Sequence, residues 1–171
     1  EGVSGHGIDA TVSEQQGAAT YSYPIAVPPG RGGMAPRLAL SYSSSGALRG
    51  GIAVGWDLSL PTIEADPNRP GSFRYAGDLL VPAPGDPGSG THYRLALDHG
   101  EMLRVVRSGD VWTASTPDGR VRTFSGAAGT SDAETRWNIT SERDAYGNTI
   151  AYDWNPYFSP DLHVDYVLSS I

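Results

Sequence analysis

The sequence predicts an all-β protein whose antiparallel meanders and hairpins form a sandwich-like or open curved sheet. Apolar and polar residues alternate along most of the chain, whereas the i, i+3, i+4, i+7 spacing of an amphipathic helix never persists for three turns. Turn formers are abundant, with 22 glycines and 13 prolines among 171 residues. Nine tyrosines, four tryptophans and three phenylalanines supply enough large apolar surface for a core.

The first strands are expected at 21–27 and 38–42, where large apolar residues occupy every second position. A Pro/Gly-rich stretch over 28–33 connects them. Farther on, alternation over 56–60 predicts that three apolar side chains point inward while the residues between them form the polar half of a strand. These three residues are Trp56, Leu58 and Leu60.

A meander follows, with strands expected at 91–97, 102–107, 111–116 and 120–124. Each connection contains a glycine, the residue that tight turns between antiparallel strands favour. Segments 64–72 and 82–90 are rich in turn formers and are expected to be loops.

A second hairpin is expected from Trp137 to Trp154, turning at residues 144–148, and a last strand from 164 to 171. That last strand has apolar residues on both faces and Asp165 as its only charge, so its edge is poorly protected. Together with a strand-like run at 8–12, it indicates a segment of a longer chain that associates through its edge strands.

Composition narrows the classes of partner. A net charge of −7 with only 12 Lys and Arg argues against nucleic acid and against anionic membrane surfaces. No stretch has the roughly 18 apolar residues of a membrane helix, so no membrane insertion by this segment is expected. No Sec signal is visible in the first ten residues, and the absence of cysteine excludes disulfides and thiolate metal sites.

Three motifs near the start point to a known family. They are residues 17–25 (GAATYSYPI), 29–42 (PGRGGMAPRLALSY) and 55–63 (GWDLSLPTI). In this order they resemble the opening of the SpvB/TcB-like N-terminal region of Rhs and YD-repeat bacterial toxins, a family that includes the Tc toxin B component and the Salmonella virulence plasmid B protein. Asp57 stands where Ser or Asn is more usual.

Later segments continue the resemblance. Residues 77–81 (GDLLV) are similar to a family "G-x-x-L-V" segment, and 137–154 resemble a hairpin like the tyrosine–aspartate repeats of Rhs proteins. The resemblance implies one SpvB-like domain over 1–171, with the opening motif at 14–63, the meander at 73–125 and the hairpin with the final strand at 136–171. The motif residues, taken as structural, are Pro29, Gly30, Arg31, Gly33, Gly55, Trp56, Leu58, Leu60, Pro61, Asp144, Gly147, Asn148 and Tyr152.

The resemblance also implies a role. In such toxins this region begins a β-rich shell that encloses a toxic C-terminal payload, and the enzymatic parts lie beyond it. The chain is therefore expected to be a non-catalytic structural segment without cofactor or metal. Its expected partners are the remainder of the same shell or a companion toxin subunit, and its expected location is extracellular after a cytoplasmic stage before release.

The sequence gives weaker support for a metal site. Asp98, His99 and Glu101, with His92 one strand away, could suggest a metal site, but a cluster in a predicted hairpin turn favours a solvated turn. Asp144 and Asn148 are short of the six to eight oxygen ligands that Ca²⁺ takes, so capping of a turn is favoured.

Two sequence motifs typical of enzymes are also absent. The Gly30–Gly33 stretch lacks the G-K-[ST] and the following helix of a phosphate loop. There is no G-x-S-x-G elbow, and the spacing of the histidines does not pair any of them with a nucleophile; the four are His6, His92, His99 and His163.

The alternative hypothesis is an autonomous carbohydrate-binding β-sandwich, in which aromatic side chains such as Trp112 and Trp154 would line a groove. Because most aromatic residues fall on the apolar face of a strand, core packing is favoured.

Overall fold

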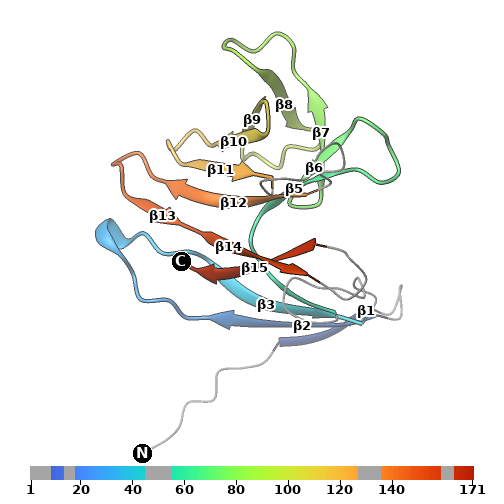
Figure 1. Cartoon of the computed structure of the whole chain (residues 1–171), viewed down its shortest axis with the longest axis vertical. Coiled ribbons are helices and arrows are strands. Elements are labelled where there is room, and N and C mark those ends of the chain that lie inside the picture. The colour runs from blue at the N-terminus through green and yellow to red at the C-terminus, as the bar shows by residue number, and fades with distance from the viewer. Residues whose placement is uncertain (1–8, 14–17, 45–54, 127–135, 159–163) are drawn as a thin grey trace, which may run out of the picture. The chain divides into compact units, whose positions relative to one another are not determined.

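The computed structural model describes residues 9–13, 18–44, 55–126, 136–158 and 164–171 (Figure 1). These residues form antiparallel strands and one short 3₁₀ turn, η1 (Arg31–Gly33), which confirms the all-β class. The chain divides into two compact units. The first comprises Glu1–Pro29 and Ala35–Leu60, and the second comprises Gly30–Met34 and Pro61–Ile171.

The first unit contains one four-stranded antiparallel sheet. Its strands, in sheet order, are β1 (Asp9–Ser13), β2 (Ala18–Ile25), β3 (Leu38–Ser43) and β4 (Trp56–Leu58). In the pairing register Tyr21 lies opposite Tyr42, which lies opposite Trp56. Paired residues of neighbouring strands share a face, so the aromatic and aliphatic residues gather on one side of the sheet.

The expected alternation over 56–60 is present in this unit. Trp56, Leu58 and Leu60 are half-buried, and the intervening Asp57 and Ser59 are exposed. None of the three is fully buried, nor is any other residue of the first unit whose side chain is described. The apolar face of this sheet is therefore only partly covered.

The second unit is built around a closed sheet of eight strands. Each strand pairs antiparallel with the next along the chain, and the eighth returns to pair with the first, so the sheet is barrel-like. The strands are β5 (Thr62–Ala65), β6 (Phe73–Tyr75), β7 (Asp78–Pro82), β8 (Thr91–Leu95), β9 (Arg104–Ser108), β10 (Val111–Ser115), β11 (Val121–Ser125) and β12 (Arg136–Arg143).

Closure is the main difference from the sandwich-like or open sheet expected from the sequence. Strand β12 is eight residues long: its first residues pair with β5, placing Trp137 opposite Ile63, while most of its length pairs with β11. A bulge between Thr123 and Phe124 shifts the β11–β12 register. Such bulges bend and twist a sheet, which helps it to close.

Large side chains fill the closed sheet. Ile63, Val105, Trp112, Phe124 and Ile139 have no measurable exposure. Because inward and outward residues alternate along each strand, a single period-two pattern supplies this core.

An aromatic cluster occupies one part of this core. The Trp112 ring lies 4.8 Å from Phe73 and 5.5 Å from Trp137 between centroids, both edge-on. Aromatic pairs prefer this arrangement.

The 82–90 loop is tied down on the outside of the sheet. Its Asp86 carboxylate lies 2.8 Å from Arg94 and 3.5 Å from Arg104, and the hydrogen bond from Arg94 is the main cause that lowers the pKa of Asp86. A Cβ on Gly90 would lie 2.6 Å from the carbonyl oxygen of Arg107, so only glycine permits this close approach.

The other expected loop is shorter than 64–72, because β5 extends through Ala65. Asp66 follows directly, is 3% exposed and accepts hydrogen bonds from the Asn68 amide and from Arg74. The Asn68 hydrogen bond is the main cause that lowers the pKa of Asp66. This carboxylate therefore organises the turn between β5 and β6.

Three further strands complete the second unit. β13 (Thr149–Ala151) pairs with β12, and β14 (Asp153–Phe158) pairs with β15 (Val164–Ser170) in a two-stranded sheet. The expected hairpin and final strand are thus present. The Trp154 indole donates a 2.6 Å hydrogen bond to the carbonyl of Ile139, which fastens β14 to the closed sheet.

Within the described part of the chain, no helix is long and apolar enough to cross a membrane.

Candidate functional site

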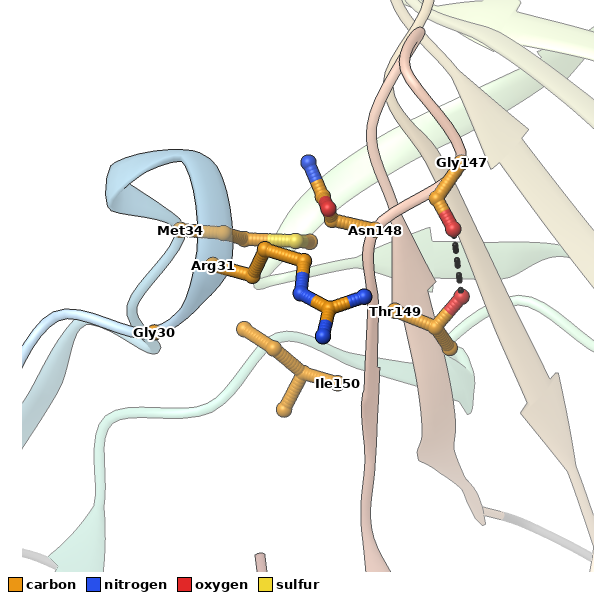
Figure 2. Close-up of a pocket in the computed structure, with 7 residues that line it drawn as sticks. All are labelled: Gly30, Arg31, Met34, Gly147, Asn148, Thr149 and Ile150. Carbon is orange, nitrogen blue, oxygen red and sulfur yellow. Dashed lines mark hydrogen bonds between the residues drawn. The ribbon is translucent and has the colours of Figure 1, made fainter.

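Two sequence motifs from opposite ends of the chain meet at a cavity of about 350 Å³ in the second unit (Figure 2). One wall comes from the 30–34 loop and the other from the hairpin that leads into β13. The cavity is lined by Gly30, Arg31, Met34, Gly147, Asn148, Thr149 and Ile150.

Three backbone hydrogen bonds shape the 30–34 loop. The Gly30 amide donates to Met34 O at 2.8 Å, the Gly33 amide to Gly30 O at 3.1 Å, and the Met34 amide to Arg31 O at 3.3 Å. Gly32 and Gly33 have φ angles of 68° and 79°. Residues with a Cβ rarely adopt this left-handed region, which explains the glycine pair. The loop has the form of a tight turn and not of a phosphate loop.

The hairpin turn is organised by Asp144. Its carboxylate accepts hydrogen bonds from the Tyr146 amide at 2.9 Å, the Asn148 amide at 2.9 Å and the Asn148 side chain at 2.8 Å. The Asn148 side-chain bond is the main cause that lowers the pKa of Asp144. Gly147 has a φ of 87°. The capping interpretation of Asp144 is confirmed.

The loop and the turn are in direct contact. A Cβ on Gly32 would lie 2.8 Å from Nδ2 of Asn148, closer than real Cβ contacts allow. Asn148 cannot easily retreat because its side chain is hydrogen-bonded to Asp144. The structure thus brings Gly30 and Arg31 together with Gly147 and Asn148, although no sequence pattern links the two motifs.

The remaining motif residues have other places. Gly55, with a φ of 74°, allows β4 to start against β3, because a Cβ there would lie 2.8 Å from the Tyr42 ring. Trp56 packs on the same Tyr42 ring at 5.1 Å between centroids. Tyr152 is 4% exposed within the second unit, and Pro29 and Gly33 are exposed. The structural role assigned to the motif residues stays a prediction.

Sequence reasoning missed a buried ion cluster inside the closed sheet. Glu142 is 6% exposed. Its carboxylate oxygens form ion pairs with the guanidinium nitrogens of Arg120 at 2.8 Å and of Arg122 at 3.0 Å. Arg122 also donates to the Tyr75 hydroxyl at 2.8 Å. The β11–β12 bulge displaces Glu142 from the simple alternation that starts at Trp137, so periodicity alone could not place it inside.

Burial also raises the pKa of the two tyrosines beside this cluster. It is the main cause that raises the pKa of Tyr75, and it raises the pKa of Tyr152 to about 12. The Glu142 carboxylate adds to the rise at Tyr152. Both phenols therefore stay protonated at neutral pH, and the arrangement is that of a satisfied polar network.

A second unexpected feature is Arg107, whose guanidinium carbon lies 5.1 Å from the Phe73 ring, 5.2 Å from Trp112 and 5.4 Å from Trp137. These distances fit cation–π contacts. Arg107 lies on the inward face of β9, as Val105 does. The sequence did not predict this position, because an arginine is normally expected on the outward face of a strand.

The structure also locates the residues considered for a metal site and for sugar binding. The Asp98 carboxylate accepts the amides of Gly100 at 2.9 Å and Met102 at 3.1 Å, which confirms the turn interpretation there. Trp112 is fully buried, so it cannot stack on a sugar. Among the described residues, no three His, Asp or Glu side chains converge in a way that could hold a metal ion.

We expect Gly32→Ala to lower the free energy of unfolding by about 2 kcal/mol and Gly33→Ala by about 1 kcal/mol, since both need a left-handed residue but only Gly32 contacts Asn148. Urea unfolding of the two variants measures the difference. In an Asn148→Ala background the difference should disappear. Equal losses in the native background would show that the 30–34 loop and the Asp144 turn are not in close contact.

Comparisons with known proteins agree with this architecture. Residues 13–70 match the family model SpvB, the Salmonella virulence plasmid 65 kDa B protein. The resemblance of the opening motifs to the SpvB region is thereby confirmed. No curated protein matches the chain significantly.

Solved toxin structures share the fold. The crystal structure of TcdB2-TccC3-TEV has a TM-score of 0.71 at 20% identity, covering 98% of this chain and 10% of that one. The Photorhabdus luminescens Tc holotoxin pore has a TM-score of 0.67 at 21% identity, covering 90% and 9%. The N-terminal domain of the effector SpvB from Salmonella typhimurium has a TM-score of 0.62 at 17% identity, covering 86% and 61%. The chain thus spans about a tenth of the Tc toxin chains that it matches.

Proposed function

We propose that this chain is a non-catalytic structural segment of a secreted Rhs/Tc-type toxin, contributing to the β-rich shell that encloses a toxic C-terminal payload. The observation that carries the proposal is the fold match along 98% of this chain to one tenth of the matched chain in the TcdB2-TccC3-TEV crystal structure. The family match over residues 13–70 supports it from the sequence side. On this proposal residues 1–171 act as a single SpvB-like domain.

The partly covered face of the first unit supports a role within a larger body. Tyr21, Tyr23 and Ile25 of β2 are 39%, 50% and 38% exposed. Tyr42 and Leu40 lie opposite the two tyrosines on β3 and are half-buried. A four-stranded sheet with this much apolar surface left open is typical of a surface that another element covers.

The strand edges support the same role. β1 ends the first sheet, and β15 has β14 as its only strand partner among the described strands. Val167 of β15 is 40% exposed, and Ile171 beyond its end is 50% exposed. Proteins usually protect an exposed edge with lysine, proline or a bulge. Residues 164–171 contain neither lysine nor proline, and the β14–β15 pairing has one register irregularity, between Asp153 and Trp154. Such edges suit pairing with further strands of a shell.

The polar groups inside the closed sheet support a structural and not a catalytic role. Glu142 is neutralised by two arginines, and Arg107 is held by three aromatic rings. These groups stabilise the fold where they are. The proposed partners are the remainder of the same shell or a companion toxin subunit, and the proposed destination is extracellular.

We expect the isolated 171-residue chain to self-associate through its C-terminal strand, because β15 presents unpaired backbone groups and exposed Val167. Light scattering over a range of concentrations should show association for the full chain and less for a version ending at Leu162. Val167→Lys should also reduce association, since a lysine protects an edge without removing the strand. Monodisperse monomers for both chain lengths would contradict the edge argument.

A further inference from the structure

The cavity between the 30–34 loop and β13 contains a charged group without a partner among the described residues. Figure 2 shows the Arg31 side chain extending into the cavity toward Thr149. Its guanidinium makes no hydrogen bond or ion pair with any residue that the structure describes. By contrast, Arg74, Arg94 and Arg122 are each paired with a carboxylate.

The walls around Arg31 are mixed, with the polar side chains of Asn148 and Thr149 beside apolar ones. Met34 and Ile150 are half-buried and contribute the apolar lining, while Gly30 and Gly147 leave the backbone accessible. Arg31 is exposed, so its guanidinium is accessible to a partner, and its planar fork matches a carboxylate in two parallel hydrogen bonds. The cavity is thus suited to a carboxylate on a side chain that also has apolar neighbours.

An open strand edge borders the same cavity. β13 pairs with β12 through Thr149, Ile150 and Ala151, and no described strand pairs with its other side. Thr149 and Ile150 are both cavity residues. An extended peptide can add to such an edge through main-chain hydrogen bonds, with its alternate side chains entering the neighbouring pocket.

We infer that this cavity is a binding site for an extended peptide segment that adds a strand to β13 and places an Asp or Glu carboxylate on Arg31. The main chain of the segment supplies the pairing with β13. Its acidic side chain supplies the selectivity, because a chain with a net charge of −7 otherwise repels acidic peptides. The site is separate from the β15 edge.

The test uses the 171-residue chain and a fluorescein-labelled, blocked seven-residue peptide in which threonine and valine alternate around a central glutamate. Fluorescence anisotropy should show saturable binding, weakened at least tenfold by Arg31→Gln. The matched control is Arg37→Gln, which removes the same charge from an exposed arginine outside the cavity and should change the affinity less than twofold. Equal losses in both variants would mean nonspecific charge attraction and would overturn the inference.

Two further peptides test the two halves of the inference. A peptide with central glutamine should bind at least tenfold more weakly, and equal affinity would overturn the role of the carboxylate. A peptide methylated on alternate backbone nitrogens, which cannot pair fully with a strand edge, should lose binding; unchanged affinity would overturn strand addition. These outcomes leave the shell proposal intact, since that proposal rests on the fold match and on the family match over residues 13–70.

Discussion

Replacing Trp112 with alanine is expected to lower the free energy of unfolding by about 3–5 kcal/mol. Trp112 is fully buried and contacts Phe73, Tyr93 and Trp137 within the closed sheet. Its removal leaves a cavity in a core whose walls are strands in a closed ring, which can relax little. The Arg107 guanidinium, 5.2 Å from the ring, also loses one of its three aromatic contacts.

Urea unfolding followed by far-ultraviolet circular dichroism measures this loss without depending on the fluorescence of the residue removed. Trp112→Phe keeps part of the aromatic contact and should cost about half as much. Tyr146→Ala is the surface control: Tyr146 is 93% exposed, so the change should stay within about 0.5 kcal/mol. A Trp112→Ala loss as small as the Tyr146→Ala loss would show that the indole is not part of the core.

Glu142→Gln is expected to lower the free energy of unfolding by about 2–4 kcal/mol, because removing one partner leaves the others as uncompensated charges. Glu142 is the only carboxylate that pairs with Arg120 or Arg122 among the described ion pairs. The two arginine side chains are 35% and 26% exposed, so water relieves part of the penalty and the loss falls at the lower end for a buried pair.

The matched control is Glu64→Gln, which removes an exposed carboxylate 3.6 Å from Arg136. Both side chains of that pair are at least 40% exposed, so the loss should be below about 1 kcal/mol. Raising the salt concentration to about 0.5 M should reduce the surface effect and leave most of the Glu142 effect, since buried charges are screened much less. Equal losses for the two variants would contradict a structural role for the buried cluster.

Local chemistry explains what the sequence could predict. The four strands of the 91–125 meander were expected within a few residues of their observed bounds, because alternation and glycine turns act between neighbours in the chain. The Asp144 turn was predictable for the same reason: its hydrogen bonds reach no farther along the chain than Asn148. The burial of Trp112 and Trp137 also followed from their place on apolar strand faces.

Only the tertiary structure decided the rest. An open and a closed sheet have the same period-two pattern, so closure depended on the pairing of Trp137 with Ile63, two residues far apart in the chain. The bulge at Thr123 and Phe124 shifted the register and set Glu142 opposite Arg122 inside the sheet. The approach of Gly32 to Asn148 likewise arises from three-dimensional packing. Turns and strands are encoded by residues a few positions apart, whereas closure, the inward charges and the Arg31 cavity depend on contacts that exist only once distant strands have paired.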